Sequence, residues 1–160
     1  MCLSHNSRKR VNKLAQRQRA GPGGLRLEGK QPLGQTMWVQ PGTRLICCLE
    51  TSKHGLYNSQ LLEVVTLGIT TCDFVDFETR RPLTLTHAAI QRHTRSAAAM
   101  TYANVQGRDF EEVGIWTASA KFSQHHLFMA LSQARSGDKV WIMDYFKNGS
   151  AQARDPAAKG

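Results

Sequence analysis

The most informative segment of this sequence runs Thr101-Tyr102-Ala103-Asn104-Val105-Gln106-Gly107-Arg108-Asp109-Phe110. The apolar residues of 97–102 predict a buried strand, and residues 103–108 predict a short helix. Where a strand turns into a helix, backbone N–H groups lack intrahelical partners and the helix dipole adds positive potential. Such a turn is suited to hold a nucleotide or nucleic-acid phosphate. The alternative is a plain strand-to-helix turn in which Gly107 serves packing only.

Helix and strand patterns alternate around this segment. A helical piece at 88–90 follows the possible cap Thr86, and residues 112–117 predict a strand. Residues 125–135 then predict a helix, and residues 139–143 predict a last strand. This order is typical of an α/β domain with a parallel sheet.

Residues 37–85 have a different composition, because β-branched and apolar residues gather there in short runs between turns. Strands are predicted at 44–49, 60–67 and 70–77, with turns at 53–55 and at Gly68. Short strands linked by tight turns indicate a small meander or barrel.

The N-terminal region predicts a surface helix over 6–19, on which Val11, Leu14 and Ala15 form a narrow apolar stripe. A Gly-Pro-Gly-Gly run at 21–24 ends this helix, and a polar loop continues to about residue 36. The predicted parts of the chain are 1–36 (first strand–helix and loop), 37–85 (small β-rich insertion), 86–146 (remainder of the α/β domain) and 147–160 (flexible tail).

Positive charge is concentrated at the N-terminal end of a chain whose net charge is +9. Residues 1–30 contain eight Lys and Arg side chains and a single acid, Glu28. This concentration favours a polyanionic partner. Arg8, Lys9 and Arg10 are candidate phosphate contacts on the predicted helix, whereas the alternative for a charged run is a solvated helix face.

Several segments, in the same relative order, resemble the C-terminal half of RecD-like superfamily 1 helicases, including viral and mobile-element proteins. Residues 101–110 resemble their motif V, commonly T-x-x-x-x-Q-G-x-E/T-F/L. Motif VI, commonly Y-V-A-L-S/T-R-A, is similar to His126-Leu127-Phe128-Met129-Ala130-Leu131-Ser132-Gln133-Ala134-Arg135. Residues 55–65 look like the G-L-x-N-G-x-x-x-V hairpin that leads into a small SH3-like insertion, and residues 3–12 look like the strand–helix that starts the second RecA-like domain.

This resemblance implies a RecA-like, P-loop NTPase-type parallel sheet half-domain with an inserted SH3-like β-barrel. It implies that Gln106 and Gly107 lie near the nucleotide cleft, with Asp109 where many members have Glu. It also implies that Thr101 lies close to the single strand. The implied role is to close the ATP cleft from one side and to grip single-stranded nucleic acid on the other.

Two departures from the family pattern limit what the chain is expected to do alone. At the arginine-finger position of motif VI the sequence has the neutral Gln133, and Arg135 two residues on faces another side of a helix. Loss of such a finger lowers phosphoryl-transfer rates by roughly 10³–10⁵. The sequence also contains no G-x-x-x-x-G-K-[S/T] phosphate loop and no Asp-Glu pair after an apolar strand. ATP and Mg²⁺ are therefore expected only if a first RecA-like domain completes the chain in cis or in trans.

Other site chemistries find little support in the sequence. The adjacent pairs His125-His126 and Cys47-Cys48 lack metal-ligand spacing, so no metal site is predicted. Ser132 lacks the G-x-S-x-G elbow of a nucleophile. No apolar run is long enough to span a membrane, and the first residues do not form a secretory signal. A reducing intracellular compartment, nucleus or cytoplasm, is therefore expected.

The sequence thus predicts the C-terminal fragment of an ATP-dependent helicase that does not hydrolyse ATP by itself. Its expected partners are single-stranded nucleic acid, DNA or RNA, and the missing first RecA-like domain. The alternative is a non-catalytic basic nucleic-acid-binding module that uses the N-terminal helix and the β-rich insertion. A third possibility is a gene fragment that does not fold stably, because half of an interdomain cleft would be exposed.

Overall fold

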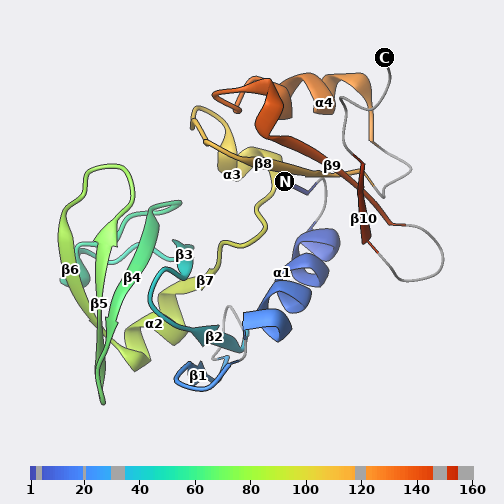
Figure 1. Cartoon of the computed structure of the whole chain (residues 1–160). Helices are drawn as coiled ribbons and strands as arrows, with labels where there is room; N and C mark the ends of the chain where they lie inside the picture. The colour runs from blue at the N-terminus through green and yellow to red at the C-terminus, as the bar shows by residue number, and fades with distance from the viewer. Residues whose placement is uncertain (3–4, 20, 30–34, 118–121, 146–150, 155–160) are drawn as a thin grey trace. The chain divides into compact units, whose positions relative to one another are not determined.

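The computed structural model describes residues 1–2, 5–19, 21–29, 35–117, 122–145 and 151–154 (Figure 1). The helices and strands, in chain order, are α1 (His5–Arg19), β1 (Leu25–Leu27), β2 (Met37–Val39), β3 (Arg44–Cys47), β4 (Leu61–Leu67), β5 (Thr71–Asp76), β6 (Pro82–Thr86), α2 (His87–His93), β7 (Thr94–Ser96), α3 (Tyr102–Val105), β8 (Val113–Trp116), α4 (Gln124–Leu131), β9 (Val140–Tyr145) and β10 (Ala151–Arg154). Short 3-10 turns lie at Ser52–His54 and Gly137–Lys139. The chain divides into two compact units, residues 12–98 and residues 1–11 with 99–160.

The unit of residues 12–98 is built on a five-stranded sheet with the strand order β6-β5-β4-β3-β7. Every neighbouring pair in this sheet is antiparallel. The loop from β4 to β5 is only residues 68–70, which is too short for the crossover that parallel strands need. Most of this sheet lies in residues 37–85, where a small meander or barrel was predicted, and not in residues 86–146, where the parallel sheet was predicted. The fold is mixed α/β with a mostly antiparallel sheet.

A closed barrel is not formed by the strands that the structure describes. The sheet ends at β6 on one side and at β7 on the other, and these two edge strands are not paired with each other. Strands β1 and β2 form a separate antiparallel ladder from Leu25–Val39 to Leu27–Met37. Strand β1 lies in the segment that was predicted to be a polar loop. The strand was missed because Leu25 and Leu27 alternate with Arg26 over only three residues, which is too short a pattern to indicate a strand.

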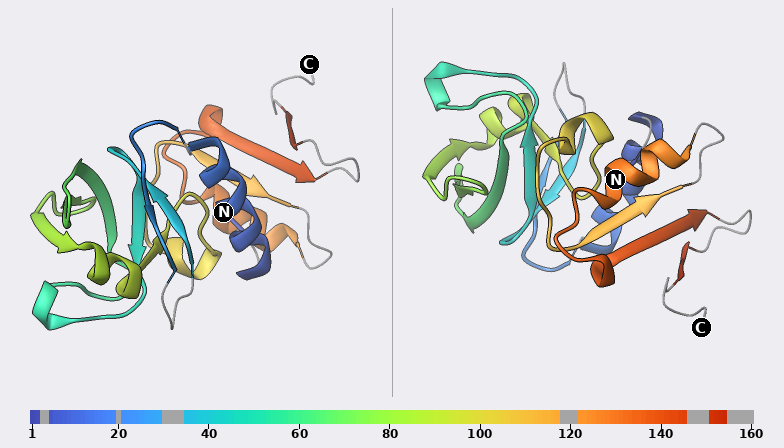
Figure 2. Two further views of the ribbon diagram at one scale, coloured as in Figure 1. Left: turned by 90° about the horizontal axis from the view of Figure 1, so that it is seen from below. Right: turned by 90° about the horizontal axis from the view of Figure 1, so that it is seen from above.

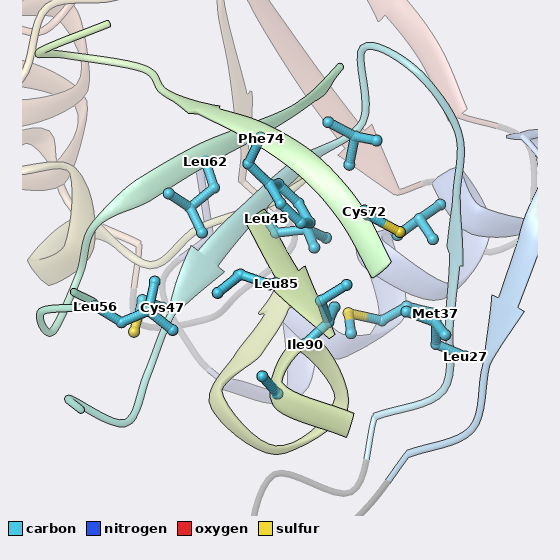
Figure 3. Packing of buried hydrophobic residues seen from close by; sticks show 13 residues of the cluster. Leu27, Met37, Leu45, Cys47, Leu56, Leu62, Cys72, Phe74, Leu85 and Ile90 are labelled. Carbon is cyan, nitrogen blue, oxygen red and sulfur yellow. The ribbon is translucent and has the colours of Figure 1, made fainter. Parts of the chain in front are cut away.

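One hydrophobic cluster holds this unit together. Its buried members come from β1–β6, the loop after β3 and α2: Leu27, Met37, Val39, Leu45, Cys47, Leu56, Leu62, Val64, Cys72, Phe74, Leu85, Ala89 and Ile90. Figure 3 shows the side chains of the strands gathered with Ile90 of α2. The predicted cap Thr86 is confirmed, because its side chain accepts a hydrogen bond from the Ala89 N–H at 3.2 Å.

The other unit contains the parallel pairing of the chain. Strands β8 and β9 run parallel in the register Val113–Val140 to Trp116–Met143, and both views of Figure 2 show them side by side. Cys2 makes parallel bridges to Thr101 and to Trp116. The buried Ala130 of α4 packs with Val113 and Ile115 of β8. Residues far apart in sequence therefore form this small parallel framework, and β10 adds an antiparallel edge.

Helix α1 buries a polar face, and of the predicted apolar stripe Val11 packs, partly buried, against the cluster of Cys2, Ala99 and Trp116. Its buried residues are Arg8, Asn12 and Gln16, which follow one another at intervals of four and so share one side of the helix. Leu14 is 42% exposed, so the prediction that Leu14 belongs to the buried stripe is wrong. The partners of Asn12 and Gln16 explain the difference, because both side chains bond to backbone groups: Asn12 to the Ser96 carbonyl at 3.1 Å and Gln16 to the Trp38 N–H at 2.5 Å.

Two further boundaries differ from the sequence prediction. The strand predicted at 97–102 lies earlier, at Thr94–Ser96, and only Thr101 of the predicted range makes a strand bridge. Three consecutive alanines at 97–99 have weak β-propensity, which favours the earlier position. The segment predicted as a flexible tail is described only at 151–154, where it forms β10. None of the described helices is long and apolar enough to cross a membrane.

Candidate functional site

The two segments at 101–110 and 126–135 lie against each other. Phe110 and Ala134 form a parallel bridge, in which the Phe110 N–H donates to the Gln133 carbonyl at 2.8 Å and the Arg135 N–H donates to the Phe110 carbonyl at 3.0 Å. The structure thus brings together the residues just after Gly107 and the C-terminal end of α4. Both segments belong to the same compact unit.

The Gln133 side chain adds a third link between these segments. Its carbonyl oxygen Oε1 accepts a hydrogen bond from the Arg108 N–H at 3.1 Å, and its amide nitrogen donates to the Ser132 hydroxyl at 3.0 Å. The Ser132 hydroxyl in turn donates to the Met129 carbonyl at 2.8 Å. Gln133 is therefore engaged within the chain, where it closes the turn that follows Gly107. Arg135 is exposed.

The turn at Gly107 depends on backbone conformation. Gly107 has φ +77°, a region that favours glycine, and a Cβ placed there would meet no atom within 4 Å. The alternative in which Gly107 serves packing only is therefore not supported. Gln106, Gly107 and Asp109 are all exposed at this turn.

The order of helix and glycine differs from the sequence prediction. Helix α3 spans Tyr102–Val105, so Gly107 lies after the end of the helix and not within the helix predicted at 103–108. Because Gly107 lies beyond the C-terminal end of α3, the helix-dipole argument for a phosphate does not apply to it. The turn around Gly107 thus presents the exposed side chains of Gln106 and Asp109, and Gln133 holds this turn in place.

Thr101 lies immediately before α3 and is only 8% exposed. Its hydroxyl donates to the Asn104 side-chain carbonyl at 2.8 Å, and its backbone bridges Cys2. The hydroxyl therefore orders the start of α3.

Helix α4 begins with a capping arrangement that uses a histidine. The Ser123 N–H donates to Nδ1 of His126 at 3.2 Å, and the Ser123 hydroxyl lies 2.7 Å from the same atom. The His126 ring also packs near Tyr102, with ring centroids 5.6 Å apart. Burial raises the pKa of Tyr102 to about 12, so its hydroxyl is neutral at physiological pH. Sequence reasoning missed the Ser123–His126 cap, because a capping box usually carries Glu or Gln at the position of His126.

The three basic candidates of α1 are placed differently from one another. Lys9 and Arg10 are exposed, but Arg8 is 4% exposed. The prediction that Arg8 contacts phosphate together with Lys9 and Arg10 is therefore corrected: Arg8 belongs to the buried polar face of α1. Neighbouring residues on a helix point in directions about 100° apart, so three consecutive cations cannot all face one partner.

The segment at 55–65 is the turn before β4 and the first part of β4, which completes an antiparallel hairpin with β3, and Asp76 fixes this turn. Gly55 and Ser59 both have positive φ, +63° and +65°. The Asp76 carboxylate, 2% exposed, accepts hydrogen bonds from the Tyr57 hydroxyl at 2.9 Å and from the Gln60 side chain at 2.7 Å. It also accepts from the backbone N–H groups of residues 78 and 79. Sequence reasoning missed Asp76, since a lone acid at the end of a strand is a common surface residue.

Metal ligation finds no support in the described part of the chain. No group of three or more His, Cys, Asp or Glu side chains there is arranged to hold a metal ion. None of the four cysteines, all of which lie among the described residues, forms a disulfide bond, and burial is the largest cause that raises the pKa of Cys2, Cys47 and Cys72.

Comparison with known proteins identifies the architecture. No protein-family model and no curated protein matches the chain. Among solved structures, a chain from a study of forked double-stranded DNA unwinding by two coordinating Pif1 helicases superposes with a TM-score of 0.63 and 18% identity, over 88% of this chain and 37% of that one. The chain has the fold of part of a Pif1 helicase.

Two further Pif1 structures from Bacteroides agree with this result. One is bound to single-stranded DNA (TM-score 0.62), and one is in complex with ADP-AlF3 and single-stranded DNA (TM-score 0.61); each is 16% identical over 89% of this chain and 39% of the other. The chain thus spans about two fifths of the length of these helicases. At this level of identity the likeness concerns the fold.

Proposed function

We propose that the chain is the C-terminal, nucleic-acid-binding portion of an ATP-dependent helicase of the RecD-like type, with a RecA-like frame and an SH3-like insertion. The observation that carries this proposal is the junction of 101–110 with 126–135 inside a fold shared with Pif1 helicases. These are the two segments that resemble helicase motifs V and VI. Two of the similar helicases are described with single-stranded DNA bound, and one with ADP-AlF3 as well.

Within this proposal, the exposed turn at Gln106, Gly107 and Asp109 faces the nucleotide cleft and helps to close it. Cleft closure needs a partner that supplies the phosphate loop and the Mg²⁺ ligands, since the sequence contains no G-x-x-x-x-G-K-[S/T]. Gln133 cannot supply positive charge to a γ-phosphate. Its side chain is instead bonded to the Arg108 N–H. We therefore expect no ATP hydrolysis by the chain alone.

Phosphate release from ATP tests this part of the proposal. The purified chain is assayed with Mg²⁺ and ATP, with and without a single-stranded oligonucleotide. The expected result is release at the background rate in both cases. Turnover above background in the presence of the strand would contradict the assignment of the catalytic phosphate loop to a missing domain.

Contact with the single strand is assigned to the start of α3, around Thr101, and to the exposed cations Lys9 and Arg10 of the same unit. Because the Thr101 hydroxyl orders Asn104, Thr101→Val should disturb this contact while keeping the branched shape of the side chain. Fluorescence anisotropy with a labelled single strand is expected to show several-fold weaker binding by Thr101→Val. Thr84→Val, an exposed threonine of β6, is the matched control and should bind like the wild type.

A second candidate is a non-catalytic basic nucleic-acid-binding module. The observation that favours it is the exposure of most cations on α1, in a helix that contains no acidic residue. In this case single-strand binding depends on α1 and not on Thr101. Unchanged affinity of Thr101→Val, together with strong weakening by Lys9→Gln with Arg10→Gln, would favour the module over the helicase portion.

A further inference from the structure

The exposed face of helix α1 carries a regular row of cations. Lys9, Lys13 and Arg17 are all exposed, and they follow one another at intervals of four residues. Residues at this interval lie on one face of a helix, about 6 Å apart along its axis, so the row extends over about 12 Å. We refer to these three residues as the cation row.

No acidic side chain of the helix neutralises the cation row. The sequence of α1 contains neither Asp nor Glu, and the first acidic residue of the whole chain is Glu28. Like charges at i and i+4 destabilise a helix, so this spacing works against the stability of α1. An exposed helix face with no binding role would be more stable if positive and negative side chains alternated along it.

The rotation of α1 about its own axis is fixed by the polar face described above. The Asn12 side-chain amide donates to the Ser96 carbonyl at 3.1 Å, and the Ser96 hydroxyl lies 3.5 Å from the Asn12 side-chain oxygen. Gln16 accepts from the Trp38 N–H. Directional hydrogen bonds set a rotation more strictly than apolar packing does, because a rotated helix would leave buried polar groups without partners. The cation row is thereby held in a defined orientation.

The kind of polyanion follows from what the helix lacks. Proteins that bind single strands combine positive charge with aromatic side chains on which bases stack. Helix α1 contains no Phe, Tyr or Trp. Lysine and arginine without aromatic partners suit a regular backbone whose bases are paired and hidden, since such contacts go to phosphate oxygens.

We infer that the cation row of α1 binds one phosphate strand of a nucleic-acid duplex, in addition to the single-strand contact proposed at Thr101, Lys9 and Arg10, with which it shares only Lys9. The inference rests on the proposed function, because it adds a duplex surface to a single-strand-binding chain. Lys9, Lys13 and Arg17 each neutralise one phosphate. Arg8 takes no part, since its side chain belongs to the buried face.

A salt titration of binding to a labelled DNA duplex of about 20 base pairs tests the inference. Each neutralised phosphate contributes roughly −0.9 to the slope of log K against log salt concentration. The triple variant Lys9→Gln, Lys13→Gln, Arg17→Gln is therefore expected to show a slope shallower by about 2.7, with affinity weakened by at least about tenfold at low salt. Glutamine is a good helix former, and circular dichroism should show an unchanged helix content.

The matched control removes the same number of positive charges from exposed positions outside α1. Lys53→Gln, Arg81→Gln and Arg92→Gln are exposed cations outside α1 and outside the proposed single-strand contact. This control is expected to keep the wild-type slope on the duplex. Equal changes of slope in both triple variants would overturn the inference, because binding would then report only net charge.

The remaining outcomes separate the inference from the proposed function. If the wild type binds a single strand but no duplex, the inference fails and the proposed function stands. If the wild type binds neither, both fail. If the α1 variant loses single-strand and duplex binding by the same factor, or loses binding to phosphatidylserine vesicles equally, the assignment to a duplex is overturned.

Discussion

Each of the two compact units is stabilised internally in a different way. The unit of residues 12–98 is an antiparallel sheet in which most neighbouring strands are also neighbours in sequence, and thirteen buried side chains form its core. The other unit joins segments that lie far apart in sequence, such as Cys2 with Thr101 and Phe110 with Ala134, and its buried clusters are smaller. The candidate site lies in the second unit. The β-rich unit therefore supplies most of the buried apolar side chains, whereas the candidate site depends on a few long-range contacts.

Loss of the largest fully buried side chain should break the β-rich unit. Phe74 of β5 is 1% exposed, and Phe74→Ala is expected to lower the free energy of unfolding by about 3–5 kcal/mol. Urea denaturation measures the loss, and hydrogen exchange should show the largest decrease of protection in β3–β6. Ile115→Val in β8 is the comparison, with an expected loss of about 0.5–1.5 kcal/mol. A wild type without a cooperative transition would instead favour an unstable gene fragment.

Removal of the Asp76 charge should loosen the turn of residues 55–60. Hydrogen bonds to a charged group contribute about 1.5–3 kcal/mol, and Asp76→Asn keeps the shape while weakening them. Burial raises the pKa of Asp76, but bonds from Thr79, Gln60 and Tyr57 outweigh it, so the pKa lies below its ordinary value.

The same shift gives a pH dependence. Because the folded-state pKa of Asp76 is lowered, its contribution to stability is present above the unfolded pKa of about 3.9 and is lost as pH falls through the lower folded value. The free energy of unfolding should therefore fall more steeply with acidification below about pH 4 in the wild type than in Asp76→Asn. Parallel pH profiles for the two proteins would contradict this role of the carboxylate.

Loss of the Gln133 side-chain contact should lower the free energy of unfolding less than the changes at Phe74 and Asp76, but it should act on one identified backbone amide. The Arg108 N–H donates both to Gln133 Oε1 and to the Val105 carbonyl, each at 3.1 Å, so Gln133→Ala removes one of its two acceptors, at an expected loss of about 0.5–1.5 kcal/mol. Hydrogen exchange of the Arg108 amide is expected to speed up. Gln133→Glu keeps an acceptor oxygen and should protect this amide better than Gln133→Ala. Gln133→Arg, which restores the family residue, removes the same side-chain acceptor and leaves only the Val105 carbonyl, so it should speed up exchange of this amide as Gln133→Ala does.

The smallest expected effect concerns a helix cap in the β-rich unit. Thr86→Ala removes the acceptor for the Ala89 N–H and should lower the free energy of unfolding by about 0.5–1 kcal/mol. Thr86→Ser retains the hydroxyl and should recover most of it. Thermal unfolding monitored by circular dichroism measures both. A loss in Thr86→Ser equal to that in Thr86→Ala would show that the cap does not stabilise α2.

Elements of the β-rich unit could be predicted from local sequence patterns, whereas the long-range contacts of the other unit could not. Strand runs at 44–49, 60–67 and 70–77 were located within two residues, because each has its own β-branched pattern and its own turn. The junction of Phe110 with Ala134 was not predicted, since no local pattern encodes a contact across 24 positions. The buried face of α1 could not be predicted from hydropathy, because Arg8, Asn12 and Gln16 are polar. The number of sheets, and whether the largest one closes into a barrel, could not be predicted, because short strands do not specify which other strands they pair with.

Binding of a single-stranded oligonucleotide by the purified chain tests the central claim most directly. Fluorescence anisotropy with a labelled strand of about 20 nucleotides is followed over a series of salt concentrations. We expect saturable binding whose affinity falls as salt rises, with a negative slope of log K against log salt. Absence of binding at the lowest salt, by a chain whose circular dichroism shows it folded, would contradict this claim.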